Sequence, residues 1–153
     1  MALGSDERKA MRDAWLTEVQ AIANYQAECA VLRRTAWTKK RRRSLELFEQ
    51  TLAEEMEHRG WFEKLDPGLP SDRAWTWANR RAGSFIGVCL SLIPSRLSWY
   101  LHHLAELKAE AANVKAGHKV TTPKALLVLK DAAQQEKQHS RRFLHEFQGS
   151  EGQ

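Results

Sequence analysis

The chain has 153 residues, 24 Lys+Arg against 19 Asp+Glu, a formal net charge of +5 and 42% hydrophobic residues. This length and composition predict one globular domain with its own core and exclude a generally disordered protein. Two cysteines are too few for a disulfide scaffold or a cysteine-based zinc site, and they are typical of a reducing compartment. The first residues of the chain lack the apolar segment of a signal peptide. The longest apolar run is shorter than the ~20 residues that a membrane span needs. We therefore expect a cytoplasmic protein.

Helix signals dominate the first half of the chain. Glycine and proline are sparse, at 8 and 4 residues, and β-branched runs are nearly absent, so strands have little support. Ser5, followed by two acids, predicts the N-cap of a helix that reaches about residue 34. After a short break we expect a second helix over about residues 39–65. The segment 66–71 contains two prolines and a glycine and ends that helix, and Ser71 can cap the next one.

The second half continues the helical pattern. A third helical region is expected over about residues 72–116, interrupted or kinked near Pro94. Thr122 followed by Pro123 predicts the start of a last helix, which runs to about residue 147. Long helices with apolar stripes and short turns predict an all-α fold, an antiparallel four-helix bundle. We expect a single domain over residues 1–148 and a disordered tail over 149–153.

Acids and histidines interrupt the apolar stripes of three predicted helices. Residues at positions i and i+3 share one helix face, so each Glu-x-x-His pair can direct a carboxylate and an imidazole at one point. Burying such groups unpaired would cost several kcal/mol, a cost that a metal ion removes. Surface salt bridges on charged helix faces are the alternative interpretation. The residues are Glu18 on the first helix, Glu55 and His58 on the second, and Glu136 and His139 on the last.

Seven cations and no acid lie in the segment Arg33–Arg43, which also contains Trp37. The net charge is therefore local, at the predicted turn between the first two helices. An aromatic side chain beside several cations favours contact with an anionic membrane surface. A solvated turn without a partner is equally compatible, and nucleic-acid phosphate is the less favoured alternative.

The chain resembles the demethoxyubiquinone hydroxylase family, the ferritin-like di-iron monooxygenases of ubiquinone biosynthesis. The resemblance spans about residues 14–147. The segments that carry it are Glu18-Val-Gln-Ala-Ile-Ala-Asn-Tyr25 with its continuation Ala30-Val-Leu-Arg-Arg-Thr35, Glu55-Met-Glu-His58, Glu136-Lys-Gln-His139, and the third-helix approach Ala82-Gly-Ser-Phe-Ile-Gly-Val-Cys89.

The resemblance implies a ferritin-like bundle that holds two iron ions per chain. In this reading Glu55 and Glu136 bridge the metals, and Glu18, His58 and His139 are terminal ligands. The family has a further glutamate on its third helix, where an ungapped alignment from Trp75 places His102 in this chain.

The third-helix ligand has three candidates. We take His102 as the sixth ligand, beside the alternatives His103 and Glu106. The apolar face through Ile93, Leu97, Tyr100, Leu104 and Leu107 lies nearer His103. Glu106, one turn after His102, would restore a carboxylate if Pro94 shifts the helix register. Tyr25 and Trp99 are candidates for residues beside the metals or in a pocket, although ordinary core packing explains both.

The resemblance further implies a di-iron monooxygenase that uses dioxygen to hydroxylate a quinone-type ring. The alternative is a degenerate ferritin-like bundle that binds metal or a partner without oxygenase activity. A hydrophobic quinone-like substrate and a homo- or hetero-oligomer are the expected partners. The basic segment Arg33–Arg43 would then place a cytoplasmic protein peripherally on the inner face of a membrane.

Overall fold

The computed structural model of the chain describes residues 3–69 and 73–149, which form five α-helices and no strand. This confirms the predicted all-α helical bundle. The predicted cap Ser71 and residues 150–153 of the predicted tail lie outside the described residues, while Gly149 belongs to the last helix. The helices are α1 (Ser5–Thr35), α2 (Lys39–Leu65), α3 (Arg73–Leu92), α4 (Ser95–Gly117) and α5 (Pro123–Gly149).

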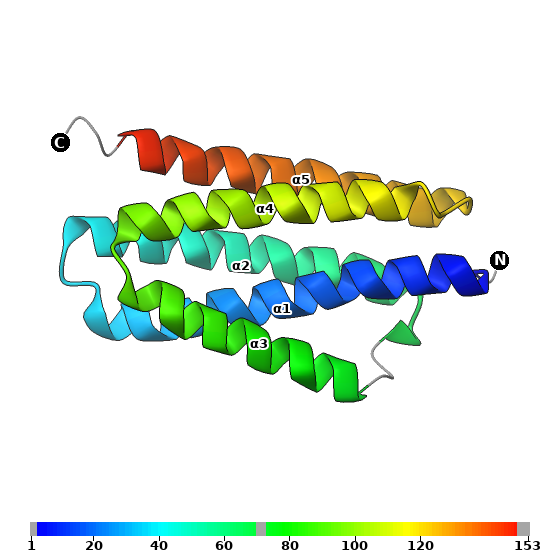
Figure 1. The fold of residues 1–153 in the computed structure, drawn as a ribbon, viewed down its shortest axis with the longest axis horizontal. Helices are drawn as coiled ribbons and strands as arrows, with labels where there is room; N and C mark the ends of the chain where they lie inside the picture. The colour runs from blue at the N-terminus through cyan, green and yellow to red at the C-terminus, as the bar shows by residue number, and fades with distance from the viewer. Residues whose placement is uncertain (1–2, 70–72, 150–153) are drawn as a thin grey trace.

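The region predicted as one interrupted helix is two helices that run in opposite directions (Figure 1). Pro94 separates them, because a proline inside a helix removes one backbone N–H and clashes with the preceding turn. Helices α1, α2, α4 and α5 form the four-helix bundle, in which α1 packs on α2 and α4 packs on α5. Helix α3 lies outside the bundle, against α1. The four-helix arrangement leaves the more specific ferritin-like assignment a prediction.

The core has two hydrophobic clusters, one toward each end of the bundle. The first contains Trp15, Phe62 and Leu129, and the second contains Tyr25 and Phe48. On α2 and α5 the predicted metal ligands lie in sequence between members of the two clusters, and on α1 Glu18 lies at the inner end of the first cluster, one residue before Val19. A buried polar layer therefore lies between two apolar ones, and the apolar layers shield it from water at both ends of the bundle.

Two glycines let α3 pack directly on the backbone of α1. A Cβ atom built on Gly83 would lie 2.2 Å from the carbonyl oxygen of Gln20, and one on Gly87 would lie 2.2 Å from that of Asn24. Only glycine fits such a close approach between two backbones. Other positions of α3 carry large apolar side chains that are exposed, among them Trp77, Phe85, Val88 and Leu92. Among the described residues, no helix combines the length and the apolar character that crossing a bilayer requires.

Helix α4 buries a polar face. Leu97, Tyr100, Leu104 and Leu107, which belong to the apolar face that lies nearer His103, are each 38–47% exposed. The buried positions of α4 are instead Ser98, Trp99, His102, Glu106 and Asn113. Helical periodicity shows which residues share a face but not which face meets the core, so the sequence left the orientation of this helix open. Here the hydrogen-bonding groups of α1 select the polar face.

Glu7 joins the start of α1 to the turn before α5. One carboxylate oxygen accepts hydrogen bonds from the backbone N–H groups of Thr121, at 2.6 Å, and Thr122, at 2.8 Å. The other accepts from the N–H of Gly4, at 3.1 Å. The cap of α1 is thus Gly4, and the predicted cap Ser5 is the first helical residue. These backbone donors lower the pKa of Glu7 from 4.5 to about 2.

Replacing Glu7 by glutamine should remove part of the acid sensitivity of the fold. Because the pKa is lower in the folded state, this carboxylate contributes its full stabilisation above about pH 4.5 and loses it as the pH falls toward 2. Urea unfolding of both proteins at neutral and acidic pH should therefore show the larger acid-induced loss in the wild type. Asp6→Asn removes the same charge at the same helix end and should keep the wild-type pH dependence. Equal pH profiles for wild type and Glu7→Gln would contradict the role of these hydrogen bonds.

Candidate metal centre

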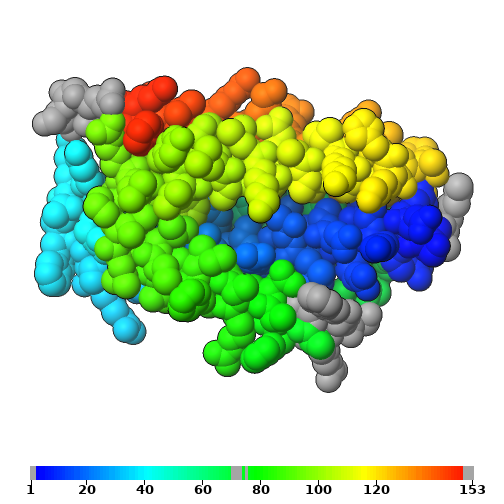
Figure 2. All heavy atoms as spheres, viewed as in Figure 1, coloured from blue at the N-terminus to red at the C-terminus, as the bar shows by residue number. Residues whose placement is uncertain are grey.

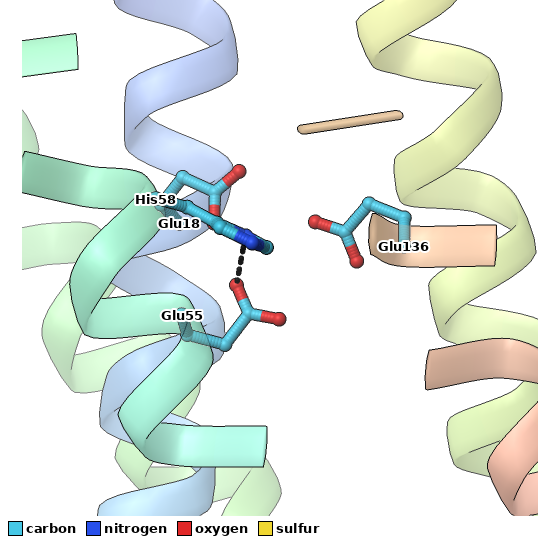
Figure 3. Close-up of side chains that lie close together, drawn as sticks. All are labelled: Glu18, Glu55, His58 and Glu136. Carbon is cyan, nitrogen blue, oxygen red and sulfur yellow. Dashed lines mark ion pairs between the residues drawn. The ribbon is translucent and has the colours of Figure 1, made fainter. Parts of the chain in front are cut away.

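Five of the six predicted ligands meet in the middle of the bundle. Glu18 from α1 and Glu55 and His58 from α2 point toward Glu136 from α5 (Figure 3). His139, one turn after Glu136, joins them from α5. All five side chains are at most 2% exposed. The i, i+3 spacing works as expected: each Glu-x-x-His pair directs both of its polar groups at the same interior space.

The cluster contains two overlapping groups of potential ligand atoms. In each group, one atom from every residue lies within 4.8 Å of the others. The first group is Glu18, Glu55, His58 and Glu136, and the second is Glu55, Glu106, Glu136 and His139. Glu55 and Glu136 belong to both groups, and a carboxylate has two oxygens with which to join two cations. The arrangement therefore matches a binuclear centre with two bridging carboxylates.

The polar atoms at the centre of the cluster lack hydrogen-bond partners. Such orphaned atoms are rare in protein interiors, and each would cost about 1–3 kcal/mol, more when charged. Direct coordination would satisfy them, so the residues present fit a metal pair. The unpartnered atoms are both carboxylate oxygens of Glu18 and of Glu55, Oε2 of Glu136, and Nδ1 of His58 and of His139.

The two histidines are held with Nδ1 toward the centre. His58 uses Nε2 to contact the amide oxygen of Gln135, and that oxygen can only accept, so Nε2 carries the proton. His139 places Nε2 2.7 Å from Oε2 of Glu54. Arg142 in turn holds Glu54 through two N–H donors at 3.0 and 3.2 Å. The carboxylates around them raise the pKa of both histidines, against the opposing effect of burial, so Nδ1 is also protonated when no cation is present. Loss of that proton would leave each imidazole with its Nδ1 lone pair toward the centre, as a metal ligand requires.

The carboxylates perturb one another because they are buried together. Burial, followed by the charge of Glu55, raises the pKa of Glu18 and that of Glu136 well above the ordinary value. Burial would also raise the pKa of Glu55, but the neighbouring His139 and His58 outweigh it and hold that pKa below its usual range. Without a cation the cluster must therefore retain protons, and metal binding would release them.

Glu106 occupies the position that the sequence assigned to His102. Glu106 belongs to the second ligand group, is 5% exposed, and accepts a hydrogen bond from the hydroxyl of Tyr25. His102 belongs to neither group: its Nε2 lies 2.7 Å from the buried carboxylate of Glu28, and its ring stacks on Tyr25. Of the three candidates in α4, the structure thus brings the alternative Glu106 to the cluster and not the preferred His102.

His103, the third candidate, lies apart from the cluster. Its Nδ1 meets the hydroxyl of Ser140 at 2.8 Å, so it packs between α4 and α5. Glu28 and Glu54 are the polar residues that the sequence analysis missed. Glu54 directly precedes the predicted ligand Glu55, and Glu28 lies one turn after Tyr25 on α1. Acids near the predicted site that could hold a histidine are the signal that would have selected them.

A groove leads from the surface to three of the clustered carboxylates. It has a volume of about 500 Å³ and lies between α1, α3 and α4, the face on which α1 is recessed between its two neighbours (Figure 2). Ile86, Leu90 and Leu101 supply apolar walls. Its polar lining includes Glu18, Tyr25, His102, Glu106 and Glu136. Tyr25 is a core residue of the second hydrophobic cluster, as ordinary core packing predicts, and it also borders this groove.

The donor set suits divalent metal ions. Four carboxylates and two imidazoles provide oxygen and nitrogen ligands, and neither cysteine belongs to the two groups. Two divalent cations would balance the charge of four carboxylates, which removes the electrostatic cost of burying them together.

Comparison of the chain with known protein families, with curated proteins and with solved structures gave no match in any of the three. Function is therefore inferred from the side chains of the cluster and from the groove above them. The described residues provide a buried Glu/His cluster that could hold metal ions, with one open side.

Proposed function

We propose that the protein is a di-iron monooxygenase similar to demethoxyubiquinone hydroxylase and hydroxylates a quinone-type ring. The observation that carries the proposal is the pair of overlapping ligand groups that share Glu55 and Glu136. With Glu106 in the second group, the candidate centre has four carboxylates, as in the di-iron carboxylate bundles. Glu106 can supply the third-helix carboxylate, so His102 at the aligned position does not by itself favour a degenerate bundle.

The groove supports a flat, apolar substrate. Its volume of about 500 Å³ lies within the range of small-molecule sites. Leu90 and Leu101 would contact the faces of a ring, while Glu18, Glu106 and Glu136 border the same space. When bound, two ferrous ions supply the reductive activation of dioxygen and the transfer of one oxygen atom to the substrate.

The chain's own residues hold the ligands in place and limit water. Tyr25 donates its hydroxyl proton to Glu106 and so fixes the orientation of that carboxylate. Glu54, which is held by Arg142, fixes the orientation of the His139 imidazole. The apolar layers at both ends of the cluster leave the groove as the side from which substrate and dioxygen approach.

Iron analysis of the bridging variants tests this proposal. After anaerobic reconstitution, we expect two irons per wild-type chain and fewer than one in Glu55→Ala or Glu136→Ala, because each variant removes a ligand from both metals. Glu57→Ala, an exposed glutamate on the same helix, is the matched control and should retain two irons. Failure of the wild type to retain iron would contradict the metal centre.

A turnover assay then separates an oxygenase from a bundle that only binds metal. Reconstituted protein, supplied with a chemical reductant, dioxygen and a quinone that bears an apolar tail, should yield a product with one added oxygen atom, detected by mass spectrometry. Iron binding without product for quinones of varied ring substitution would favour the metal-binding bundle without oxygenase activity.

A further inference from the structure

Helix α4 carries large apolar side chains on the face that is turned away from the bundle. The face toward the bundle is polar and includes His102, Glu106 and Asn113, which are buried. A helix on a protein surface normally has the opposite arrangement, with its apolar side toward the core. A continuous apolar face in contact with water marks a surface on which another element packs.

The spacing of these outward residues is that of a coiled-coil seam. Steps of three and four residues alternate along α4 without interruption, and all six positions are uncharged. Such a repeat fits another helix, because its members form one stripe with which the side chains of a second helix can interdigitate. We call this stripe the α4 seam, and its members, all exposed, are Leu97, Tyr100, Leu104, Leu107, Ala111 and Val114.

The exposed apolar residues of α3 form a shorter stripe. Arg81, one turn before Phe85, lies on the same face of the helix and places its guanidinium 5.6 Å from the ring centroid of Trp77. A cation therefore interrupts this face, and the uninterrupted part from Phe85 to Leu92 covers two turns. The α4 seam instead extends through most of a 23-residue helix, which makes it the better surface for a partner helix.

The α4 seam is complementary to itself when two copies run antiparallel. Tyr100 then lies opposite the partner's Ala111, so the largest side chain of the seam meets the smallest. Leu104 lies opposite the partner's Leu107 at the centre. In a parallel pair, by contrast, two tyrosines would share one layer and two alanines another, which would overfill the first layer and leave a gap in the second.

The residues beside the seam agree with the antiparallel arrangement. Lys108 would lie beside the partner's Leu101, and Glu110 beside the partner's His103. The aliphatic part of a lysine can cover a leucine while its ammonium group stays in water. Like charges therefore do not meet at these four positions, and the second copy satisfies both the shape and the charge of the surface.

We propose that the protein forms a two-fold symmetric dimer in which the α4 seams of two copies pack antiparallel. A two-fold axis requires that one surface patch be complementary to itself, and the seam meets this requirement. The dimer does not depend on the proposed oxygenase function, because no member of either potential ligand group belongs to the seam.

Sedimentation equilibrium of the full chain tests the dimer. Wild-type protein should be mainly dimeric at about 100 μM, with a dissociation constant on the order of 10 μM. Leu104→Glu/Leu107→Glu should raise this constant at least about a hundredfold, because four carboxylates would meet at the centre of the interface. Both residues are exposed, so the helical circular dichroism and the melting temperature of the monomer should remain close to those of the wild type.

Phe85→Glu/Leu92→Glu is the matched control. It adds the same charge and removes two exposed apolar side chains, but from α3. This variant should remain dimeric at the same concentration. A monomeric wild type would overturn the proposal. Equal dissociation of the two double variants would also overturn it, since added charge alone would then explain the loss of the dimer.

Disulfide crosslinking tests the antiparallel arrangement. Cys89→Ser removes the exposed cysteine, and the remaining Cys29 is buried. In this background, mild oxidation of a mixture of Leu97→Cys and Val114→Cys should yield a dimer that contains one chain of each variant, identified by its mass. The antiparallel seam places these two positions opposite each other, within reach of a disulfide. Crosslinking of each variant only with itself would show a parallel pair and contradict the proposal.

Discussion

Replacing Glu106 by alanine should reduce the iron content from two ions per chain to about one. Glu106 belongs only to the second ligand group, so its loss removes one of four ligands from one metal and none from the other. The hydroxyl of Tyr25 would also lose its acceptor. Because loss of one ligand opens the coordination of the second iron, product formation should fall by at least about a hundredfold. Iron quantification after anaerobic reconstitution, with turnover measured on the same samples, checks both expectations.

His102→Gln is the informative comparison. The amide retains a hydrogen bond to Glu28, and no potential ligand of either group is changed. This variant should therefore keep two irons per chain, with stability lowered by about 0.5–1.5 kcal/mol because the ring that stacks on Tyr25 is lost. The reverse pattern, normal iron in Glu106→Ala and loss of iron in His102→Gln, would contradict the ligand assignment and restore the one predicted from sequence.

Adding a methyl group at the contact between α1 and α3 should strongly destabilise the protein. In Gly83→Ala or Gly87→Ala, the new Cβ would meet a backbone carbonyl oxygen at 2.2 Å, and a backbone cannot turn aside as a flexible side chain can. Each variant should lose about 1–3 kcal/mol, and the double variant should release α3 from α1. Urea unfolding measures the loss, and hydrogen exchange of the α3 amides reports the release.

Gly60→Ala provides the control for these glycine variants. Gly60 lies within helix α2, and a Cβ there meets nothing within 4 Å. Alanine should stabilise this position by about 0.5–1 kcal/mol, because it restricts the unfolded chain and favours the helix. Wild-type stability in both Gly83→Ala and Gly87→Ala would show that α3 does not depend on backbone contact with α1.

Local signals explain why so much of the helical architecture could be predicted. Thr122 and Pro123 mark the start of α5, and α2 has the predicted bounds Lys39–Leu65. Caps, prolines and glycines act within a few residues, so they can be read without knowledge of the fold. Pro94 also showed that the third region is interrupted. Its sequence did not show that the interruption reverses the chain and places α3 outside the bundle, because that depends on the contact of two glycines with a distant helix.

Some of the candidate ligands could be predicted from local sequence signals and others could not. Glu55, His58, Glu136 and His139 follow from their spacing within a helix. The choice between His102 and Glu106 does not, because residues four apart share one helix face and differ only in their depth along the bundle axis. That depth is set by the register of α4 against α1, where the hydroxyl of Tyr25 meets Glu106. The register between helices that are distant in sequence depends on tertiary packing, so it could not be predicted from the pattern of a single sequence.

The outward apolar face of α4 has a thermodynamic consequence for the whole bundle. Full burial of a leucine stabilises a protein by about 1.5–3 kcal/mol. Leu97, Leu104 and Leu107 are 42–47% exposed, so the observed rotation of α4 leaves part of that stabilisation unused. Hydrogen bonds hold it in the observed rotation, through His102 with Glu28 and Glu106 with Tyr25. The orientation of this helix therefore follows its buried polar contacts rather than its apolar face. Two cations bound at the proposed centre would strengthen that preference, so metal binding would help to determine which side of α4 the molecule presents to its surroundings.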